Sequence, residues 1–215
     1  GAAISVISPR MQNKTINTIA SKIPIVTIDS DAPSSDRIAF IGPSQYESGI
    51  AAANEIIKLK NRNEIAIFTG NPNSENSKNR ILGMKQILEK SSLKIKFVKN
   101  DRGDFNTAVK NVTDVINNNP DVNTLVGLWS YNGPAIIEAL KHIRCSKNTK
   151  VIAFDDEFST LEGIKLGLIH CSIAFKPFIY GYETAKFFEN CSKLYADQNN
   201  PFKWINTGFE VINKR

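Results

Sequence analysis

The sequence of 215 residues has few of the side chains on which most enzymes and metalloproteins depend. It contains three cysteines in no CxxC pair, Cys145, Cys171 and Cys191, and two histidines. Widely spaced cysteines in odd number argue against a zinc site and a disulfide framework, so we expect buried free thiols, with a single bridge as the alternative. The GxSxG, GxxxxGK[S/T], GxGxxG and HExxH motifs are also missing. We therefore predict a protein that is not an enzyme, with no cofactor and no metal.

Long apolar runs and clustered charge are missing as well. No run approaches the ~18 residues needed to span a bilayer, and no signal peptide is apparent in the opening residues, GAAISVISP. The net charge is +6, but the most basic stretches, 58–62 and 94–102, are interrupted by apolar or acidic residues. Scattered basic residues are typical of solvated surfaces. We expect neither membrane insertion nor nucleic-acid binding by this chain.

What the sequence does contain is a regular alternation of strand and helix patterns. Short β-branched runs predict strands at 2–7, 24–29, 37–42, 64–69, 94–99, 124–129, 149–155 and 170–175. Apolar residues at helical spacing predict helices at 45–60, 77–90, 134–143, 159–166 and 178–194. This order predicts an α/β fold with open, doubly wound parallel sheets, which bind ligands beyond the carboxyl ends of their strands.

Polar and aromatic side chains gather at the ends of those strands and just beyond them. The candidate ligand-binding residues are Asp29, Asp31, Arg80, Phe105, Trp129, Tyr131, Asn132, Asp155 and Phe175. Carboxylates, an amide, an arginine and aromatic rings suit a small polyhydroxylated ligand, whose hydroxyls form hydrogen bonds while its C–H faces stack on rings.

Seven of these nine candidates also have a structural alternative. The alternatives are turn caps for Asp29 and Asp31, ion pairs with Glu75 or Glu89 on an exposed helix face for Arg80, core packing for Phe105 and Trp129, and helix caps for Asn132 and Asp155. A cation site at Asp155 and Asp156 is a further alternative. The joint placement of these residues at the ends of successive strands favours ligand binding.

In order and spacing, several segments together resemble the type I periplasmic sugar-binding proteins of the ribose/galactose group, whose fold also occurs in the effector domains of LacI-type repressors. The segments are IPIVTIDSDAP, IAFIGPSQYESG, IAIFTG, GDFNTA, LVGLWSYNGPAIIEAL, VIAFDDEFSTLEGIKLG and IAFKPFIYGYETAK. The resemblance implies two Rossmann-like, doubly wound parallel-sheet lobes joined by a hinge. We expect a first lobe of 1–42 plus 177–200 and a second of 43–176 plus 205–215, with a terminal strand at 205–213.

The resemblance also implies residue roles. Asp29 matches the first-lobe carboxylate that holds sugar hydroxyls, Arg80 the arginine at a helix start and Phe105 the stacking aromatic residue. Asn132 and Asp155 match an amide and a carboxylate that bind further hydroxyls. Trp129 or Tyr131 is expected to help Phe105 form the stacking surface. Two departures, Phe175 in place of glutamine and Ser30 in place of a basic residue, argue against ribose itself.

The expected function is that of a monomeric receptor that holds a sugar between its lobes and delivers it to an ABC permease or a membrane sensor. Such a receptor is periplasmic or extracellular, and lipid-anchored in a Gram-positive organism. The alternative is an effector-binding domain of a LacI-type regulator or of a sensor. The resemblance further implies two βα units before the strand at 2–7, so we expect an incomplete first lobe and weak ligand binding by these 215 residues alone.

Overall fold

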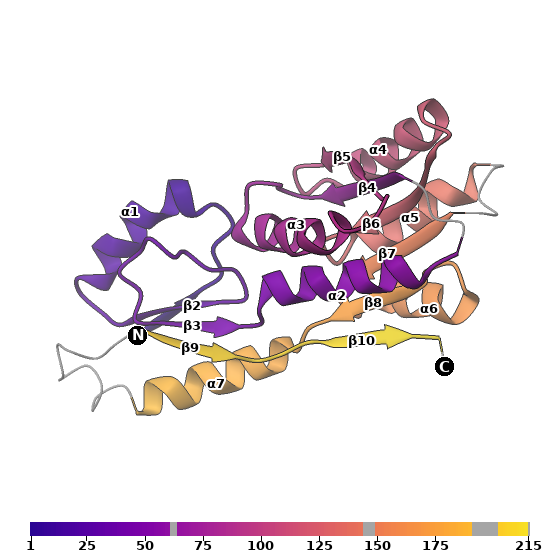
Figure 1. Ribbon diagram of the computed structural model, residues 1–215. Coiled ribbons are helices and arrows are strands. Elements are labelled where there is room, and N and C mark those ends of the chain that lie inside the picture. Colours follow the sequence, from indigo (N-terminus) through magenta and orange to yellow (C-terminus); the bar gives the residue numbers. More distant parts are fainter. Residues whose placement is uncertain (61–63, 144–148, 191–201, 215) are drawn as a thin grey trace. The chain divides into compact units, whose positions relative to one another are not determined.

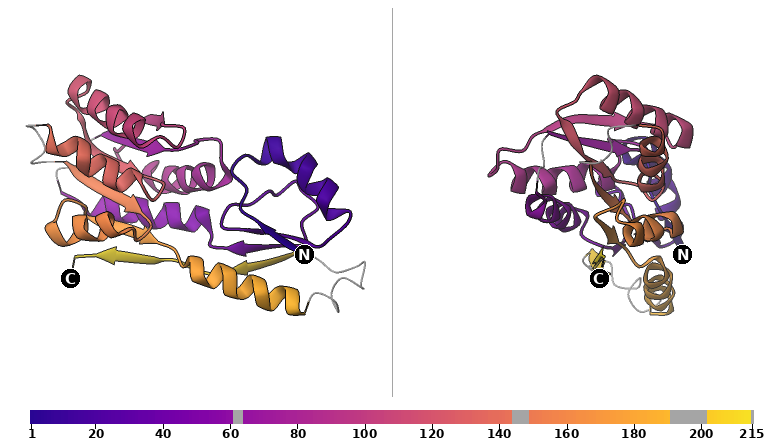
Figure 2. Two further views of the ribbon diagram at one scale, coloured as in Figure 1. Left: turned by 180° about the vertical axis from the view of Figure 1, so that it is seen from behind. Right: turned by 90° about the vertical axis from the view of Figure 1, so that its right-hand side faces the viewer.

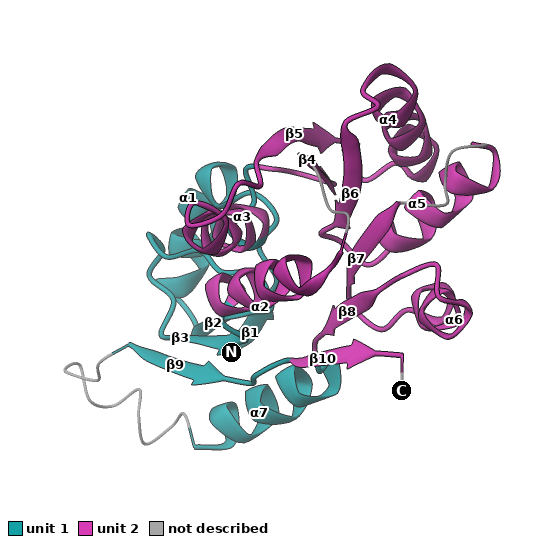
Figure 3. Cartoon of the chain, turned by 45° about the vertical axis from the view of Figure 1, so that its right-hand side comes forward, with its two compact units in different colours: residues 1–44, 73–76, 176–209 teal, residues 45–72, 77–175, 210–215 magenta. Residues whose placement is uncertain are grey.

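The computed structural model describes residues 1–60, 64–143, 149–190 and 202–214, which form two compact units. The smaller unit comprises 1–44, 73–76 and 176–209, and the larger unit comprises 45–72, 77–175 and 210–215 (Figure 3). The predicted lobes differ from these units mainly at the segments that cross between them.

The smaller unit is a parallel sheet with a helix on each face. Its strands follow the order β1 (Ala2–Ile4), β2 (Ile25–Ile28), β3 (Ala39–Gly42) and β9 (Lys203–Asn206). Helices α1 (Pro9–Ala20) and α7 (Pro177–Glu189) lie on opposite sides of this sheet (Figure 1). The central strands β2 and β3 are apolar and largely buried, with Val26 and Ile41 packing against Phe187 of α7, whereas the edge strands β1 and β9 are partly exposed.

The larger unit has a six-stranded sheet. The strand order is β10 (Glu210–Asn213), β8 (Cys171–Ala174), β7 (Lys150–Phe154), β6 (Val122–Gly127), β4 (Glu64–Thr69) and β5 (Ile95–Asn100). Strand β10 runs antiparallel to β8, and the other neighbours in this sheet are parallel.

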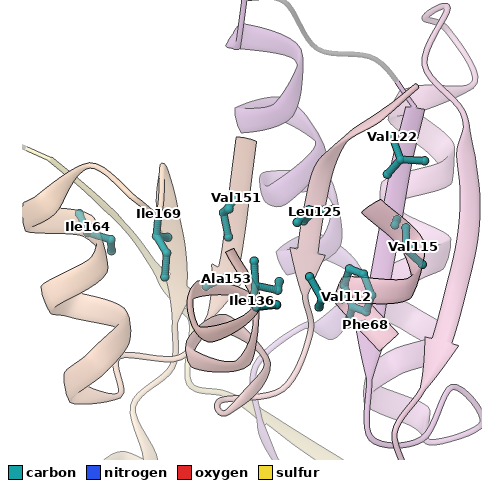
Figure 4. Close-up of a cluster of buried hydrophobic side chains, with 12 residues drawn as sticks. Phe68, Val112, Val115, Val122, Leu125, Ile136, Val151, Ala153, Ile164 and Ile169 are labelled. Carbon is teal, nitrogen blue, oxygen red and sulfur yellow. The ribbon is translucent and has the colours of Figure 1, made fainter. Parts of the chain in front are cut away.

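Five helices cover the two faces of this larger sheet. On one face lie α2 (Gln45–Lys58) and α3 (Glu75–Leu88), and on the other lie α4 (Phe105–Asn118), α5 (Asn132–Lys141) and α6 (Phe158–Leu166) (Figure 3). Helices α4 and α5 lie side by side (Figure 2). Their apolar stripes pack on the sheet, with Val112 and Ile136 in one buried cluster with Phe68 and Leu125 (Figure 4).

The α/β class and parallel sheets are confirmed, but two helices were not predicted. Helix α1 is rich in Asn and Thr, and only Pro9 and Ile16 are fully buried along it. Helix α4 is rich in β-branched residues, although Asp104 caps it and Ala108, Val112 and Val115 face the core at helical spacing. The predicted helix 178–194 extends beyond Asn190, outside the described residues.

The single predicted terminal strand, 205–213, is wrong. Two strands occupy this segment, and β9 pairs with β3 in the smaller unit whereas β10 pairs with β8 in the larger one. A turn separates them: Gly208 has a φ of 68°, and its N–H donates to the Asn206 side chain at 3.0 Å. An Asn followed two residues later by Gly is a turn signal that the prediction overlooked.

Among the cysteines, Cys171 is a buried free thiol, as predicted. Burial raises its pKa to about 12, so the thiol stays protonated and unreactive. Cys145 and Cys191 lie outside the described residues. Within the described ranges, no helix is long and apolar enough to cross a membrane.

Helices α2 and α3 approach each other closely through two glycines. A Cβ on Gly49 would lie 2.0 Å from the Arg80 carbonyl oxygen, and a Cβ on Gly83 would lie 2.0 Å from the Tyr46 carbonyl oxygen. Because backbone atoms fill these places, neither position accepts a larger residue without moving a helix. This contact fixes the backbone of Arg80, one of the candidate ligand residues.

We therefore expect Gly49→Ala to lower the free energy of unfolding by about 1–3 kcal/mol, through overpacking. The matched control is Gly181→Ala in α7, where an added Cβ meets nothing within 4 Å. That change should instead stabilise by about 0.5–1 kcal/mol, from helix propensity alone. Urea denaturation of both variants tests this, and equal effects at the two positions would contradict the close contact.

Candidate ligand-binding site

Two aspartates occupy equivalent places in the two units. Asp29 follows β2 and donates its N–H to Ile41 at 3.1 Å, and Asp155 follows β7 and donates its N–H to Ile173 at 2.8 Å. Their φ angles are 58° and 69°, in the left-handed region that non-glycine residues seldom adopt. Such strain clusters at functional positions, and aspartate tolerates it better than most side chains.

The surroundings of both aspartates are partly open. Both residues are half-buried. The Asp29 carboxylate lies 3.5 Å from the Ser5 hydroxyl, which donates to it. The Ser172 hydroxyl donates to the backbone carbonyl of Asp155 and supports its turned backbone. A helix-capping role for Asp155 is wrong, because Glu157 caps α6 by accepting from the Ser159 N–H at 3.1 Å.

Asp31 has an internal role in the smaller unit. Its carboxylate accepts from the Thr27 hydroxyl at 2.5 Å, from the Ala32 N–H at 2.7 Å and from the Arg37 guanidinium at 2.7 Å. Arg37 in turn lies over the Phe202 ring, 4.4 Å from its centroid. This carboxylate therefore fixes the segment after β2, and a ligand contact by Asp31 stays a prediction.

Arg80 is buried, with 3% of its surface exposed, rather than lying on an exposed helix face. Its Nε donates to the Gln45 side chain at 2.7 Å, and its Nη1 donates to the Leu128 carbonyl. The guanidinium carbon lies 4.6 Å from the Phe154 ring centroid and 4.7 Å from that of Phe175. The two rings stabilise the buried cation by cation–π attraction. The structure thus brings the candidates Arg80 and Phe175 together.

Trp129 and Phe105 differ in their environment. The Trp129 indole N–H donates to the Ser77 hydroxyl at 3.1 Å, and its ring lies edge-on to Tyr131 with centroids 6.3 Å apart. A Cβ on Gly70 would lie 2.3 Å from the indole, so this ring packs directly on backbone. Phe105 is 42% exposed, which makes the core alternative wrong for this residue and leaves its ring accessible for stacking.

A buried carboxylate that the prediction did not select links Tyr131 and Asn132. Asp101, directly after β5, is 1% exposed and accepts from the Tyr131 hydroxyl and from Asn132 Nδ2, the latter at 2.8 Å. Asn132 Oδ1 accepts from the Trp129 N–H at 3.0 Å. Asn132 is the first residue of α5 rather than its cap, so the capping alternative is wrong. The position of Asp101 beyond a strand end was the available signal.

The described acidic side chains of the site are not clustered in the way that metal ligands are. Among the described residues, no group of three or more His, Cys, Asp or Glu side chains lies close enough to hold a metal ion. The Asp29, Asp31 and Asp101 carboxylates instead have hydroxyl, amide or guanidinium partners. This arrangement suits hydrogen-bonding ligands.

The residue before Phe105 provides a pH-dependent test of how α4 presents that ring. Asp104 accepts from the Thr107 N–H at 2.7 Å, and hydrogen bonding by the Thr107 side chain together with this N–H lowers the Asp104 pKa below its ordinary value of 3.8. A lowered pKa means that the cap stabilises α4 above 3.8 and is lost as pH falls through the lower, folded value. The Thr107 amide chemical shift should titrate with a midpoint below 3.8 in NMR spectra, and Asp104→Asn should abolish this titration. A midpoint at or above 3.8 would contradict the cap.

Comparison with known proteins agrees with this architecture. A search of curated proteins finds no match. Among solved structures, a glucose-galactose binding protein from Geobacillus stearothermophilus has a TM-score of 0.91 at 24% identity, covering 99% of this chain and 76% of its own. An ABC transporter solute-binding protein from Burkholderia graminis, in complex with D-arabinose, has a TM-score of 0.87 at 29% identity, with 99% and 74% covered. An arabinose binding protein from G. stearothermophilus has 0.81 at 29%, with 99% and 76% covered.

A family model described as a periplasmic binding protein domain matches residues 1–190, most of the chain. The two parallel-sheet units and their sugar-binding structural neighbours agree with that match. The chain belongs to the periplasmic binding protein domain family.

Proposed function

We propose that this chain is a solute-binding receptor that holds a small sugar for an ABC transporter. The observation that carries the proposal is the similarity, at 29% identity over 99% of this chain, to a solute-binding protein solved in complex with D-arabinose. A second protein at the same identity is an arabinose binding protein. A pentose such as D-arabinose is therefore the first ligand to test.

The chemistry of the candidate residues supports a sugar. A carboxylate accepts hydrogen bonds from neighbouring hydroxyls, and Asp29 and Asp155 hold such carboxylates at the ends of strands in half-buried places. The exposed ring of Phe105 offers a surface for the C–H face of a sugar. Ionised acceptors and an aromatic ring together match a ligand that is polar at its edges and apolar on its faces.

The proposed mechanism is binding without chemical change to the ligand. A ligand stabilises the conformation of the protein that binds it better, and only by the difference in affinity between the conformations. The receptor then presents its loaded arrangement to a permease. We place this step in the periplasm or outside the cell, where such receptors act.

A membrane sensor is the second candidate partner. One similar structure, at 28% identity and a TM-score of 0.86, is a XylFII–LytSN complex. A receptor that signals through a partner protein uses the same sugar-binding step as a transport receptor. The two proposals therefore share the ligand site and differ in which protein recognises the loaded form.

Isothermal titration calorimetry with D-arabinose, tagatose, galactose and ribose tests the proposal on the full-length protein. We expect one of these sugars to bind, and Asp29→Asn and Asp155→Asn each to weaken that binding by about 1.5–3 kcal/mol, the value of a hydrogen bond to a charged group. The matched controls are Asp36→Asn and Asp156→Asn, which remove exposed carboxylates nearby in the same units.

The outcomes separate two kinds of error. If no sugar in a wider panel of pentoses, hexoses and polyols binds the full-length protein, the proposed function is wrong. If a sugar binds and the control variants lose as much affinity as Asp29→Asn and Asp155→Asn, the function stands and the assignment of these two aspartates fails.

A further inference from the structure

The Asp101 carboxylate joins two loops at the carboxyl edge of the larger sheet. It lies in the β5–α4 loop, which leads to Phe105, and it binds Tyr131 and Asn132 from the β6–α5 segment. One of its oxygens accepts from the Gly103 N–H at 2.9 Å and from the Tyr131 hydroxyl, and the other accepts from Asn132 Nδ2. All these partners are donors, and a carboxylate is an acceptor through both oxygens.

The partners of Asn132 fix the orientation of its side-chain amide. The Trp129 backbone N–H can only donate, so the amide oxygen must face it, at 3.0 Å. The Asp101 carboxylate only accepts, so the amide nitrogen must face that side, at 2.8 Å. A flipped amide would place a donor against a donor and an acceptor against an acceptor at a fully buried residue. One orientation is therefore strongly preferred.

Tyr131 is held by the same carboxylate. Its hydroxyl donates to Asp101, and burial together with the negative charge of Asp101 raises the Tyr131 pKa above its ordinary value. The phenol therefore keeps its proton at all physiological pH values, and this proton is directed at Asp101. Its oxygen in turn is near the Gly103 and Asn132 donors, so the four groups form one network.

We infer that Asp101 is a positioning residue for the sugar site, because it fixes the amide orientation of Asn132 and ties that residue to the loop that carries Phe105. This inference rests on the proposed function. It differs from the family resemblance, which points to Asn132 and Phe105 themselves and not to the carboxylate behind them.

An exchange of the two side chains tests the inference on the full-length protein. Asp101→Asn alone replaces one acceptor oxygen by an NH2 donor. That NH2 group faces either the Gly103 N–H or Asn132 Nδ2, both of which are donors. Turning the Asn132 amide instead places its own NH2 group against the Trp129 N–H. We expect lower thermal stability and affinity for the bound sugar reduced about tenfold or more, as for a buried polar group left unpaired. The matched control, Asp114→Asn, removes an exposed carboxylate in the same unit and should change neither.

The double variant D101N/N132D restores one donor and one acceptor across this contact, and its carboxylate at 132 still accepts from Trp129. We expect its melting temperature to return toward that of the wild type while its sugar affinity stays about tenfold or more below it, because the negative charge moves from position 101 to position 132, which the family resemblance assigns to the ligand. A residue with a purely structural role would recover stability and affinity together.

The results distinguish this inference from the proposed function. If the wild type binds a sugar and Asp101→Asn binds it equally well, or if D101N/N132D regains full affinity, the positioning role is wrong and the function stands. If the wild type binds no sugar, the proposed function is wrong, and so is the inference that Asp101 positions residues for a sugar. If Asp101→Asn binds the sugar weakly and the double variant recovers stability but not affinity, the proposed function and the positioning role of Asp101 are both supported.

Discussion

The backbone hydrogen bonds from Asp29 to Ile41 and from Asp155 to Ile173 are the constraint on which the candidate site depends. Each continues the parallel pairing by one residue beyond the end of a strand. The aspartate nitrogen is thereby fixed while a positive φ turns the chain away from the sheet. The carboxylate is positioned by the backbone of two neighbouring strands, so its placement needs no long side chain to be ordered when a ligand binds.

Each unit has one such aspartate among its described residues. The two positions are therefore equivalent, but the side chains near them differ. In the smaller unit the next carboxylate, Asp31, is neutralised by Arg37 and accepts from Thr27 and Ala32. In the larger unit Asp156 is exposed. Similar positions beyond equivalent strands thus hold one internally paired carboxylate and one solvated carboxylate. Placement at a strand end alone does not decide which side chains can meet a ligand.

Local sequence pattern was sufficient for the strands as far as β8 and for the positions that follow them, but not for the two strands at the end of the chain. Buried parallel strands are apolar on both faces, so segments such as Lys150–Phe154 are recognisable without any partner, and Asp155 is located as soon as its strand is. Helices were harder. Helices α1 and α4 are stabilised by packing on their sheets more than by propensity, and α4 is stabilised also by its Asp104 cap.

The sequence alone did not show whether a polar side chain is buried or which groups it contacts. Arg80 is buried because Gln45 and Leu128, which are 35 and 48 positions away, supply acceptors. Asp101 is buried because Tyr131 and Asn132, 30 and 31 positions away, supply donors. Burial of a charge depends on such distant partners, and one sequence does not reveal them. Residues that hold others in place are therefore harder to predict than residues that follow a strand.

Phe175 illustrates how a single position changes what a site can recognise. Its ring and that of Phe154 are 6.1 Å apart between centroids, and both lie against the Arg80 guanidinium. A phenyl ring stabilises a buried cation but offers no hydrogen bond to a hydroxyl, whereas the glutamine expected from the family resemblance can donate and accept. A sugar hydroxyl directed at position 175 would lose its water partners and gain none there. We therefore propose that the ring at this position disfavours sugars that direct a hydroxyl toward the end of β8.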